Sequence, residues 1–360
     1  MANSASRIRP PALPVSRTCI WKTVGEVRIA LDIYLPSSND GTNHPIMLYI
    51  HGGGWIASNK TDYSRPLFHK FLALGFVIVS MDYRLLPETT FDGQLEDIRD
   101  VESWLKNNLP LELEEINFKV ATDKIVVAGA SAGAHLALLT PKLWSTLPAS
   151  ILSLYGPTDM RRVPYLRRGR LSQCDAPSCT PEVLAAATNY GKPPTDMGCS
   201  NIPLGFSTPR SQINLMMFRE GLSAEVLLKG LIRGEDGALR MPDKGSVTSE
   251  EIDEISPLQL CQRIRYPPIY QVIGTSDDIF DTYHVTEFHD ALTAQGIHCE
   301  KVLVPEKGHA FDVYEKVGGE VHTKILNPAA EWAAAFALGP GGHRVRATAD
   351  SPPESPLCCC

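Results

Sequence analysis

The 360-residue sequence lacks three features that would assign it to large functional classes. It has no basic surplus, since 34 Lys and Arg stand against 41 Asp and Glu and leave a net charge of −7, which argues against a nucleic-acid-binding protein. It has no apolar run of about 18 residues, the length that a membrane-spanning helix requires. It contains neither a phosphate-binding loop nor a dinucleotide-binding fingerprint. Its composition is otherwise that of a globular protein, with 43% hydrophobic and 21% charged residues.

The nine cysteines show neither a Cys-x-x-Cys pair nor metal-ligand spacing, so reduced thiols in a reducing compartment are expected. Residues 1–17 form a proline-rich, flexible segment without the apolar core of a secretory signal, which favours a cytoplasmic location. Residues 339–360 are rich in Gly, Pro and Ser and are expected to be disordered. They end in Cys358, Cys359 and Cys360, whose lipidation is the alternative that would bring the protein to a membrane.

Short apolar runs alternate with helical periods along much of the chain. Two extended runs, 18–24 and 27–35, predict a hairpin. The runs that follow are typical of strands buried on both faces: 46–50, 77–81, 125–128, 151–155, 269–273 and 299–304. Helical periods lie between them, and a last helix is expected through Trp332. This order predicts an α/β fold with a mostly parallel central sheet and helices on both faces.

The alternation stops between Asp159 and Ser256. A structureless loop of that length would be unusual, so a helical cap inserted at about 160–255 is expected within a domain spanning 18–338. Helices are predicted near 183–187 and 213–228. The insertion opens with an arginine group, which we interpret as exposed surface in preference to an anion site: Arg161, Arg162, Arg167, Arg168 and Arg170.

The segment Gly-Ala-Ser-Ala-Gly at 129–133 lies directly between a predicted buried strand and a run of helix-forming residues. A serine on such a tight strand-to-helix turn needs small neighbours, and glycines stand two residues before and after it. Ser131 is therefore the candidate nucleophile, and the free N–H of Ala132 should point at a group bonded to its oxygen.

The segment His51-Gly52-Gly53-Gly54-Trp55, here called the glycine loop, follows the predicted strand 46–50. Successive glycines let a chain turn several N–H groups toward a ligand, and a loop after the third strand can form an oxyanion hole in this way. His51 is expected to brace the loop through a hydrogen bond and not to act as a base.

The glycine loop, the segment Asp-Tyr-Arg-Leu-Leu-Pro-Glu at 82–88 and the elbow 129–136 together resemble the hormone-sensitive-lipase-like carboxylesterases of the α/β-hydrolase superfamily. The sequence is also similar to kynurenine formamidases. The resemblance covers about residues 18–338, with leucine at position 86 where alanine is usual.

The resemblance implies an α/β-hydrolase fold and a Ser–acid–His order. A strand ending in Gly-x-x-Asp places the acid at Asp277, although Asp278 and Asp281 stand close enough to leave the choice open. The segment Gly-His-Ala-Phe then makes His309 the base, and Gly53, Gly54 and Ala132 form the oxyanion hole.

Other histidines are interpreted as structural. His135 should pack against its helix, and His284 with His289 should lie on a solvated helix face, because their spacing of five does not suit a helical metal site.

The expected function is a serine esterase that cleaves an ester or lactone of a small to medium, mostly uncharged substrate, with a role in secondary metabolism and without metal or cofactor. Three alternatives remain at this stage. The first is a kynurenine-formamidase-like aryl-amide hydrolase, and the second is an acyltransferase. The third is a non-catalytic small-molecule receptor of the same fold.

Overall fold

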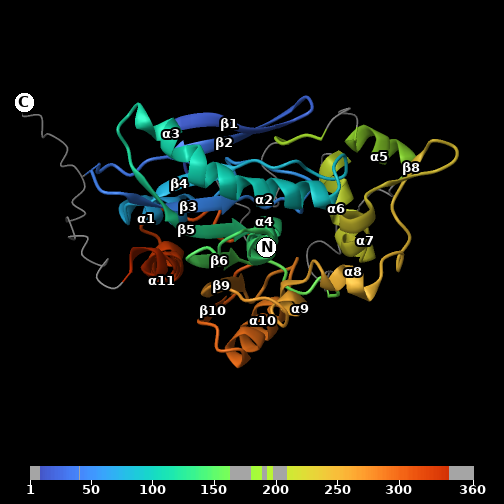
Figure 1. Ribbon diagram of the computed structural model, residues 1–360. Helices are drawn as coiled ribbons and strands as arrows, with labels where there is room; N and C mark the ends of the chain where they lie inside the picture. The colour runs from blue at the N-terminus through green and yellow to red at the C-terminus, as the bar shows by residue number, and fades with distance from the viewer. Residues whose placement is uncertain (1–8, 40, 163–179, 189–192, 198–208, 340–360) are drawn as a thin grey trace, which may run out of the picture.

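The computed structural model describes residues 9–39, 41–162, 180–188, 193–197 and 209–339. These residues fold around an eight-stranded sheet with the order β1-β2-β4-β3-β5-β6-β9-β10 (Figure 1). The first two strands pair antiparallel as the predicted hairpin, β2 also runs antiparallel to β4, and all other pairs are parallel. The strands are β1 (Arg17–Val24), β2 (Val27–Tyr34), β3 (His44–Ile50), β4 (Val77–Met81), β5 (Val120–Ala130), β6 (Ser150–Leu154), β9 (Ile269–Gly274) and β10 (Cys299–Val304).

Every residue of the central strands β3, β4, β6 and β9 is buried. Burial on both faces explains why these strands read as continuous apolar runs, since helices cover the sheet on each side. The predicted mostly parallel sheet with helices on both faces is therefore confirmed.

The following helices pack on the sheet. Helices α1 (Arg65–Ala73) and α11 (Asn327–Leu338) pack against each other, while α2 (Phe91–Asn107) contacts α4 (Ala132–Leu143), and α10 (Tyr283–Ala294) contacts β9 and β10. Their starts follow from local sequence: the Ser64 hydroxyl accepts the N–H of Leu67 at the start of α1, with a proline in the first turn. The short helix α3 (Leu109–Glu114) and the π-helical turn η3 (His322–Leu326) precede β5 and α11, respectively.

The chain between β6 and β9 carries further helices, most of which gather at one end of the molecule in Figure 1, while the last of them lies beside α10. The predicted stretch 213–228 is two helices, because the chain turns at Gly221, which has a φ of 69°. A two-stranded hairpin follows that the sequence reading did not anticipate. The elements are α5 (Pro181–Ala187), α6 (Pro209–Glu220), α7 (Ser223–Lys229), β7 (Ile232–Arg233), β8 (Leu239–Arg240), α8 (Ser249–Asp253) and α9 (Pro257–Leu260).

Several predictions concern residues outside the described part of the chain. These are residues 1–8 of the N-terminal segment, the C-terminal segment from residue 340 onward with its three cysteines, and three of the insertion's arginines (Arg167, Arg168, Arg170). Arg161 and Arg162, which the structure describes, are exposed as expected.

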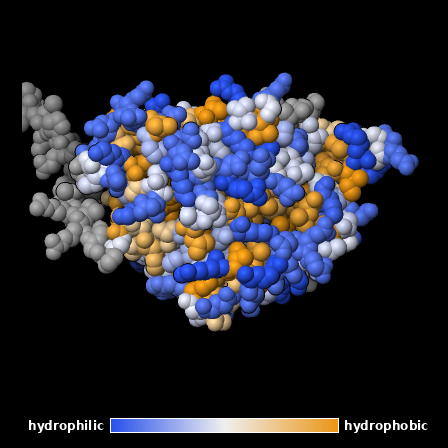
Figure 2. Space-filling view, in the orientation of Figure 1, coloured by the Kyte–Doolittle hydropathy of each residue, from blue (hydrophilic) through white to orange (hydrophobic). Residues whose placement is uncertain are grey.

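Within the described residues, Cys19, Cys261 and Cys299 are free thiols. None of the helices described is long and apolar enough to cross a membrane. Figure 2 shows hydrophilic side chains over most of the visible face, with smaller apolar patches between them.

Candidate active site

Ser131 lies on a sharp turn between β5 and α4, at the carboxyl edge of the parallel strands. Its φ of 54° and ψ of −123° are unusual for a residue with a side chain, and such a backbone costs of order 1–3 kcal/mol. The turn is possible because its neighbours are glycines: a Cβ on Gly129 would lie 2.7 Å from the amide nitrogen of Ala134. The N–H of Ser131 donates to the carbonyl of Leu154 at 2.9 Å, and this hydrogen bond attaches the turn to β6. Ala132 begins α4, so its N–H has no acceptor within the helix.

Three of the predicted residues meet at this turn. Nε2 of His309 lies 3.0 Å from Oγ of Ser131, and Nδ1 of His309 lies 2.8 Å from Oδ2 of Asp277. The side chains of His309 and Asp277 are only 2% and 1% exposed, so both hydrogen bonds are shielded from water. Because a carboxylate oxygen only accepts, Nδ1 carries the proton and Nε2 is left to accept from the serine hydroxyl.

The structure brings Asp277, of the three neighbouring aspartates, to the histidine. Its other oxygen, Oδ1, accepts the backbone N–H groups of Ile279 and Phe280, both at 2.9 Å. Asp281 instead accepts the N–H of Tyr283 at 2.8 Å. Hydrogen bonds on both oxygens therefore hold the Asp277 carboxylate in one orientation toward His309.

Aromatic rings fix the plane of the His309 imidazole. The rings of Tyr155 and Phe280 contact it edge to face, with distances of 4.8 and 5.5 Å between ring centroids. The Tyr155 hydroxyl donates to Oδ1 of Asp312 at 2.7 Å, and burial raises the pKa of the Asp312 carboxyl. The histidine is thus held by packing as well as by its two hydrogen bonds.

The glycine loop is held by its carbonyl groups. Nδ1 of His51 binds the Gly52 carbonyl at 2.8 Å, and the Tyr83 hydroxyl donates to the same oxygen at 3.3 Å. The Gly53 carbonyl accepts the N–H of Ala57 at 3.0 Å. In a trans peptide the C=O and the next N–H point in opposite directions, so bonds to these two oxygens set the directions of the Gly53 and Gly54 N–H groups. His51 makes the bracing bond expected of it.

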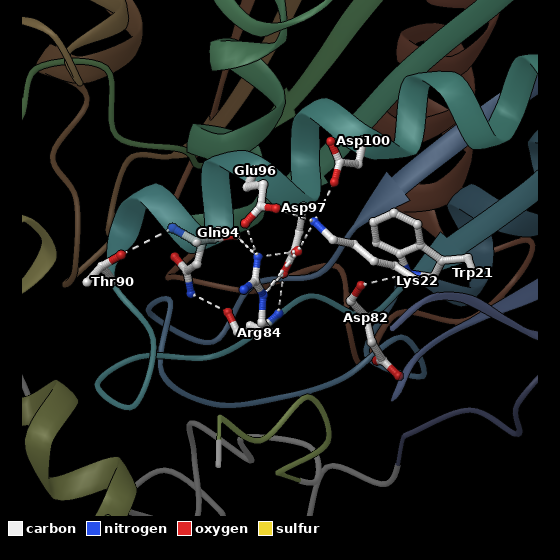
Figure 3. Close-up of polar contacts among 10 residues, drawn as sticks. Trp21, Lys22, Asp82, Arg84, Thr90, Gln94, Glu96, Asp97 and Asp100 are labelled. Atoms are coloured by element: carbon white, nitrogen blue, oxygen red, sulfur yellow. Dashed lines mark hydrogen bonds and ion pairs between the residues drawn. The ribbon is translucent and has the colours of Figure 1, made fainter. Parts of the chain in front are cut away.

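A polar cluster joins the segment 82–88 to α2, and Figure 3 shows Arg84, Gln94 and Asp97 within it. The Gln94 side chain donates to the carbonyls of Trp55 and Arg84 at 2.8 and 2.9 Å. The Arg84 guanidinium binds the fully buried carboxylate of Asp97, which also pairs with Lys22 at 2.9 Å. Paired charges of this kind can be buried because each has a partner. The arginine of the recognised segment therefore positions the glycine loop through Gln94.

Asp82, the first residue of that segment, holds the stretch that follows the loop. It accepts the Lys60 N–H at 2.6 Å and pairs with the Lys60 ammonium at 3.1 Å. Burial raises the pKa of the Asp82 carboxyl to about 6, although the Lys60 charge opposes that shift.

His135 is buried, as predicted, and does not reach the serine. Its Nε2 donates to the Ile255 carbonyl at 2.7 Å, and its Nδ1 accepts the indole N–H of Trp55 at 3.3 Å. His135 thereby connects the elbow helix to the glycine loop.

The interpretation of His284 is wrong. It is 3% exposed, not solvated, and its Nδ1 accepts the N–H groups of Thr158 and Asp159 at 3.2 and 3.3 Å. The first turn of α10 faces the chain segment that follows β6, and this contact buries the side chain. In the part of the chain that the structure covers, no group of His, Cys, Asp and Glu could hold a metal ion.

Asn214 of α6 is a residue that the sequence reading missed. Its Nδ2 donates to the Gly53 carbonyl at 2.9 Å and so joins the bonds that set the Gly54 N–H direction. No motif marks it, since it stands 161 positions from its partner in a segment without a recognised pattern.

Two comparisons of sequence bear on this site. Residues 31–178 match the family model described as BD-FAE. The chain is 32% identical over 333 residues to a non-reducing polyketide synthase, mapC, of Penicillium brevicompactum. The match covers 87% of this chain but 13% of the synthase, so the chain spans a small part of the length of this relative.

Solved structures share the fold at low sequence identity. Esterase 2 of Thermogutta terrifontis, phosphonylated by sarin, superposes with a TM-score of 0.56 at 19% identity and covers 90% of this chain and 95% of its own. An alpha/beta hydrolase superfamily protein from Enterococcus faecalis gives 0.55 at 19% identity, covering 88% and 98%. The expected α/β-hydrolase fold is confirmed.

Proposed function

Because the chain has the α/β-hydrolase fold, we propose that it is a serine hydrolase that cleaves a carboxylic ester or lactone through an acyl-enzyme. The continuous chain of hydrogen bonds from Ser131 through His309 to Asp277, with lengths of 3.0 and 2.8 Å, carries this proposal.

In the proposed reaction His309 accepts the hydroxyl proton as Ser131 Oγ attacks the carbonyl carbon. The resulting imidazolium is stabilised by the Asp277 carboxylate, and the negative oxygen by the N–H groups of Gly53, Gly54 and Ala132, each worth about 3 kcal/mol in the transition state. The C–O bond to the leaving group then breaks, and His309 returns the proton to the departing alcohol. Water, deprotonated by the same histidine, releases the acid and restores the serine.

The similarity to a polyketide synthase supports an acyl group of polyketide type and hence a role in secondary metabolism. The same similarity favours acyl transfer as a second candidate, in which another alcohol or amine replaces water in the last step. Both candidates use the same three residues, so they differ only in the group that attacks the acyl-enzyme.

A fluorophosphonate probe tests the proposal, since it reacts with activated serines as sarin does with the esterase of similar fold. We expect covalent labelling of the protein, lost in Ser131→Ala and retained in Ser153→Ala, a matched serine on β6. Absence of labelling in the folded wild-type protein would contradict the proposal. A panel of short and long p-nitrophenyl esters, with N-formylkynurenine as the amide, then identifies the substrate class, and added alcohols or amines reveal acyl transfer.

A further inference from the structure

Residues 9–16, here called the N-terminal strap, precede β1 and are attached to the core of the protein. The N–H of Leu13 donates to the Tyr63 hydroxyl at 3.0 Å. At the start of the strap, the Arg9 guanidinium forms an ion pair with the Asp62 carboxylate, and these two side chains are only 18% and 12% exposed. The strap therefore brings a positive charge, largely shielded from water, to the stretch that follows the glycine loop.

Asp62 connects this charge to the glycine loop. Its Oδ1 binds Arg9, and its Oδ2 accepts the Ser58 hydroxyl at 2.6 Å. Ser58 is fully buried and packs on Gly53, since a Cβ on that glycine would lie 2.8 Å from Cβ of Ser58. Because both carboxylate oxygens are bound, Asp62 keeps one orientation and holds Ser58 in contact with one of the three proposed oxyanion donors.

The same charge acts on the histidine side of the site. Fully buried Asp312 accepts the Tyr155 hydroxyl, and the Tyr155 ring packs on the His309 imidazole with 4.8 Å between ring centroids. Burial raises the pKa of the Asp312 carboxyl, and the hydrogen bond from Tyr155 and the positive charge of Arg9 oppose this rise. Arg9 thereby favours the ionised carboxylate, which is the stronger acceptor for the Tyr155 hydroxyl.

We propose that Arg9 is a positioning residue of the candidate active site, and that its charge supports the oxyanion donors through Asp62 and the imidazole through Asp312. This assignment rests on the proposed hydrolase function. A guanidinium suits the role because it stays charged throughout the pH range in which proteins fold and carries five donors at the end of a long side chain. The site is then complete only when the N-terminal strap is in place.

The first test is kinetic and uses p-nitrophenyl butyrate. Arg9→Met keeps the bulk of the side chain but removes its charge, so the oxyanion donors and the imidazole should lose part of their alignment. We expect kcat per folded molecule to fall about tenfold with KM little changed, because misalignment affects the transition state more than it affects substrate binding. Circular dichroism measures the folded fraction.

Two further variants separate positioning from a loss of stability alone. Arg9→Lys keeps the charge and should recover most of the lost kcat. Arg17→Met removes another arginine near this end of the chain, which pairs with Glu112 at 2.9 Å, and should keep the wild-type kcat. A wild-type kcat in folded Arg9→Met, or a loss that Arg9→Lys does not recover, would overturn the assignment.

Hydrogen exchange measured by mass spectrometry distinguishes this assignment from the proposed function, because it needs no substrate. In Arg9→Met, the amides of residues 51–62 and 309–315 should exchange about tenfold faster than in the wild type, while those of β6 should keep their rate. That result together with no hydrolysis of any ester by the wild type would contradict the hydrolase proposal alone. Unchanged exchange in either of the two segments would contradict the role of Arg9.

Discussion

Three buried histidines should make the protein sensitive to mild acid. Burial lowers the pKa of His51, His135 and His284 to about 4, from an ordinary value of 6.5. Because the folded-state pKa lies below the unfolded one, the unfolded chain takes up these protons first as the pH falls. The folded protein therefore keeps its full unfolding free energy, as far as these histidines determine it, above about pH 6.5. It loses that free energy progressively as the pH falls toward 4.

The size of the loss follows from those values. Between pH 7 and pH 5, each histidine should cost about 2 kcal/mol of unfolding free energy, and the three together about 6 kcal/mol. The pKa of Asp82 is raised to about 6, so this carboxyl has the opposite effect. It increases the unfolding free energy by about 1 kcal/mol over the same pH range. The remaining loss is comparable with the total stability of many proteins, about 5–15 kcal/mol.

Urea unfolding at pH 7 and pH 5, followed by circular dichroism, measures the difference. In His284→Asn the amide oxygen can still accept the N–H groups of Thr158 and Asp159 but does not titrate, so the drop in stability should be about 2 kcal/mol smaller than in the wild type. His289→Asn, on the same helix, is the matched control and should keep the full drop. An identical drop in wild type and His284→Asn would refute the reasoning.

Three further predictions concern the site. Ser131→Ala and His309→Ala should each lower kcat roughly a millionfold, and the double variant little more, because the residues act as a unit; steady-state kinetics showing additive losses would contradict this. Asp277→Asn should lower kcat about ten-thousandfold by favouring the wrong imidazole tautomer, while Asp278→Asn should have a small effect; the reverse order would move the acid by one residue. Gln94→Met removes the buried side-chain donor that joins the carbonyls of Trp55 and Arg84, so both stability and kcat should fall, whereas Gln262→Met on the exposed surface should change neither.

The sheet and the three central residues could be predicted because their signals are local. A strand buried on both faces is a continuous apolar run, and a nucleophile turn needs glycines at fixed positions around Ser131. The sequence leaves Asp277 and Asp278 open, because adjacent loop residues point in different directions, and the backbone N–H groups of Ile279 and Phe280 in the same loop orient the Asp277 carboxylate.

Side chains in the chain between β6 and β9 could not be assigned in the same way. Asn214 binds the glycine loop and Arg210 binds Ile56 directly after it, but the sequence around them carries no motif or strand that fixes their direction. The prediction for His284 fails for a related reason: its spacing to His289 excludes a helical metal site but does not tell which side of α10 faces the chain after β6.

The attachment of α6 to the glycine loop bears on the exchange of parts between related proteins. Asn214 binds the Gly53 carbonyl of the loop, and Arg210 binds the carbonyl of Ile56 directly after it. A transplanted helix from a relative would therefore be compatible with this loop only if it carried an arginine and an asparagine four positions apart, facing Glu88 and Gly53. The stability of such a graft therefore depends on these two side chains. The residues around them can vary when a new substrate is sought.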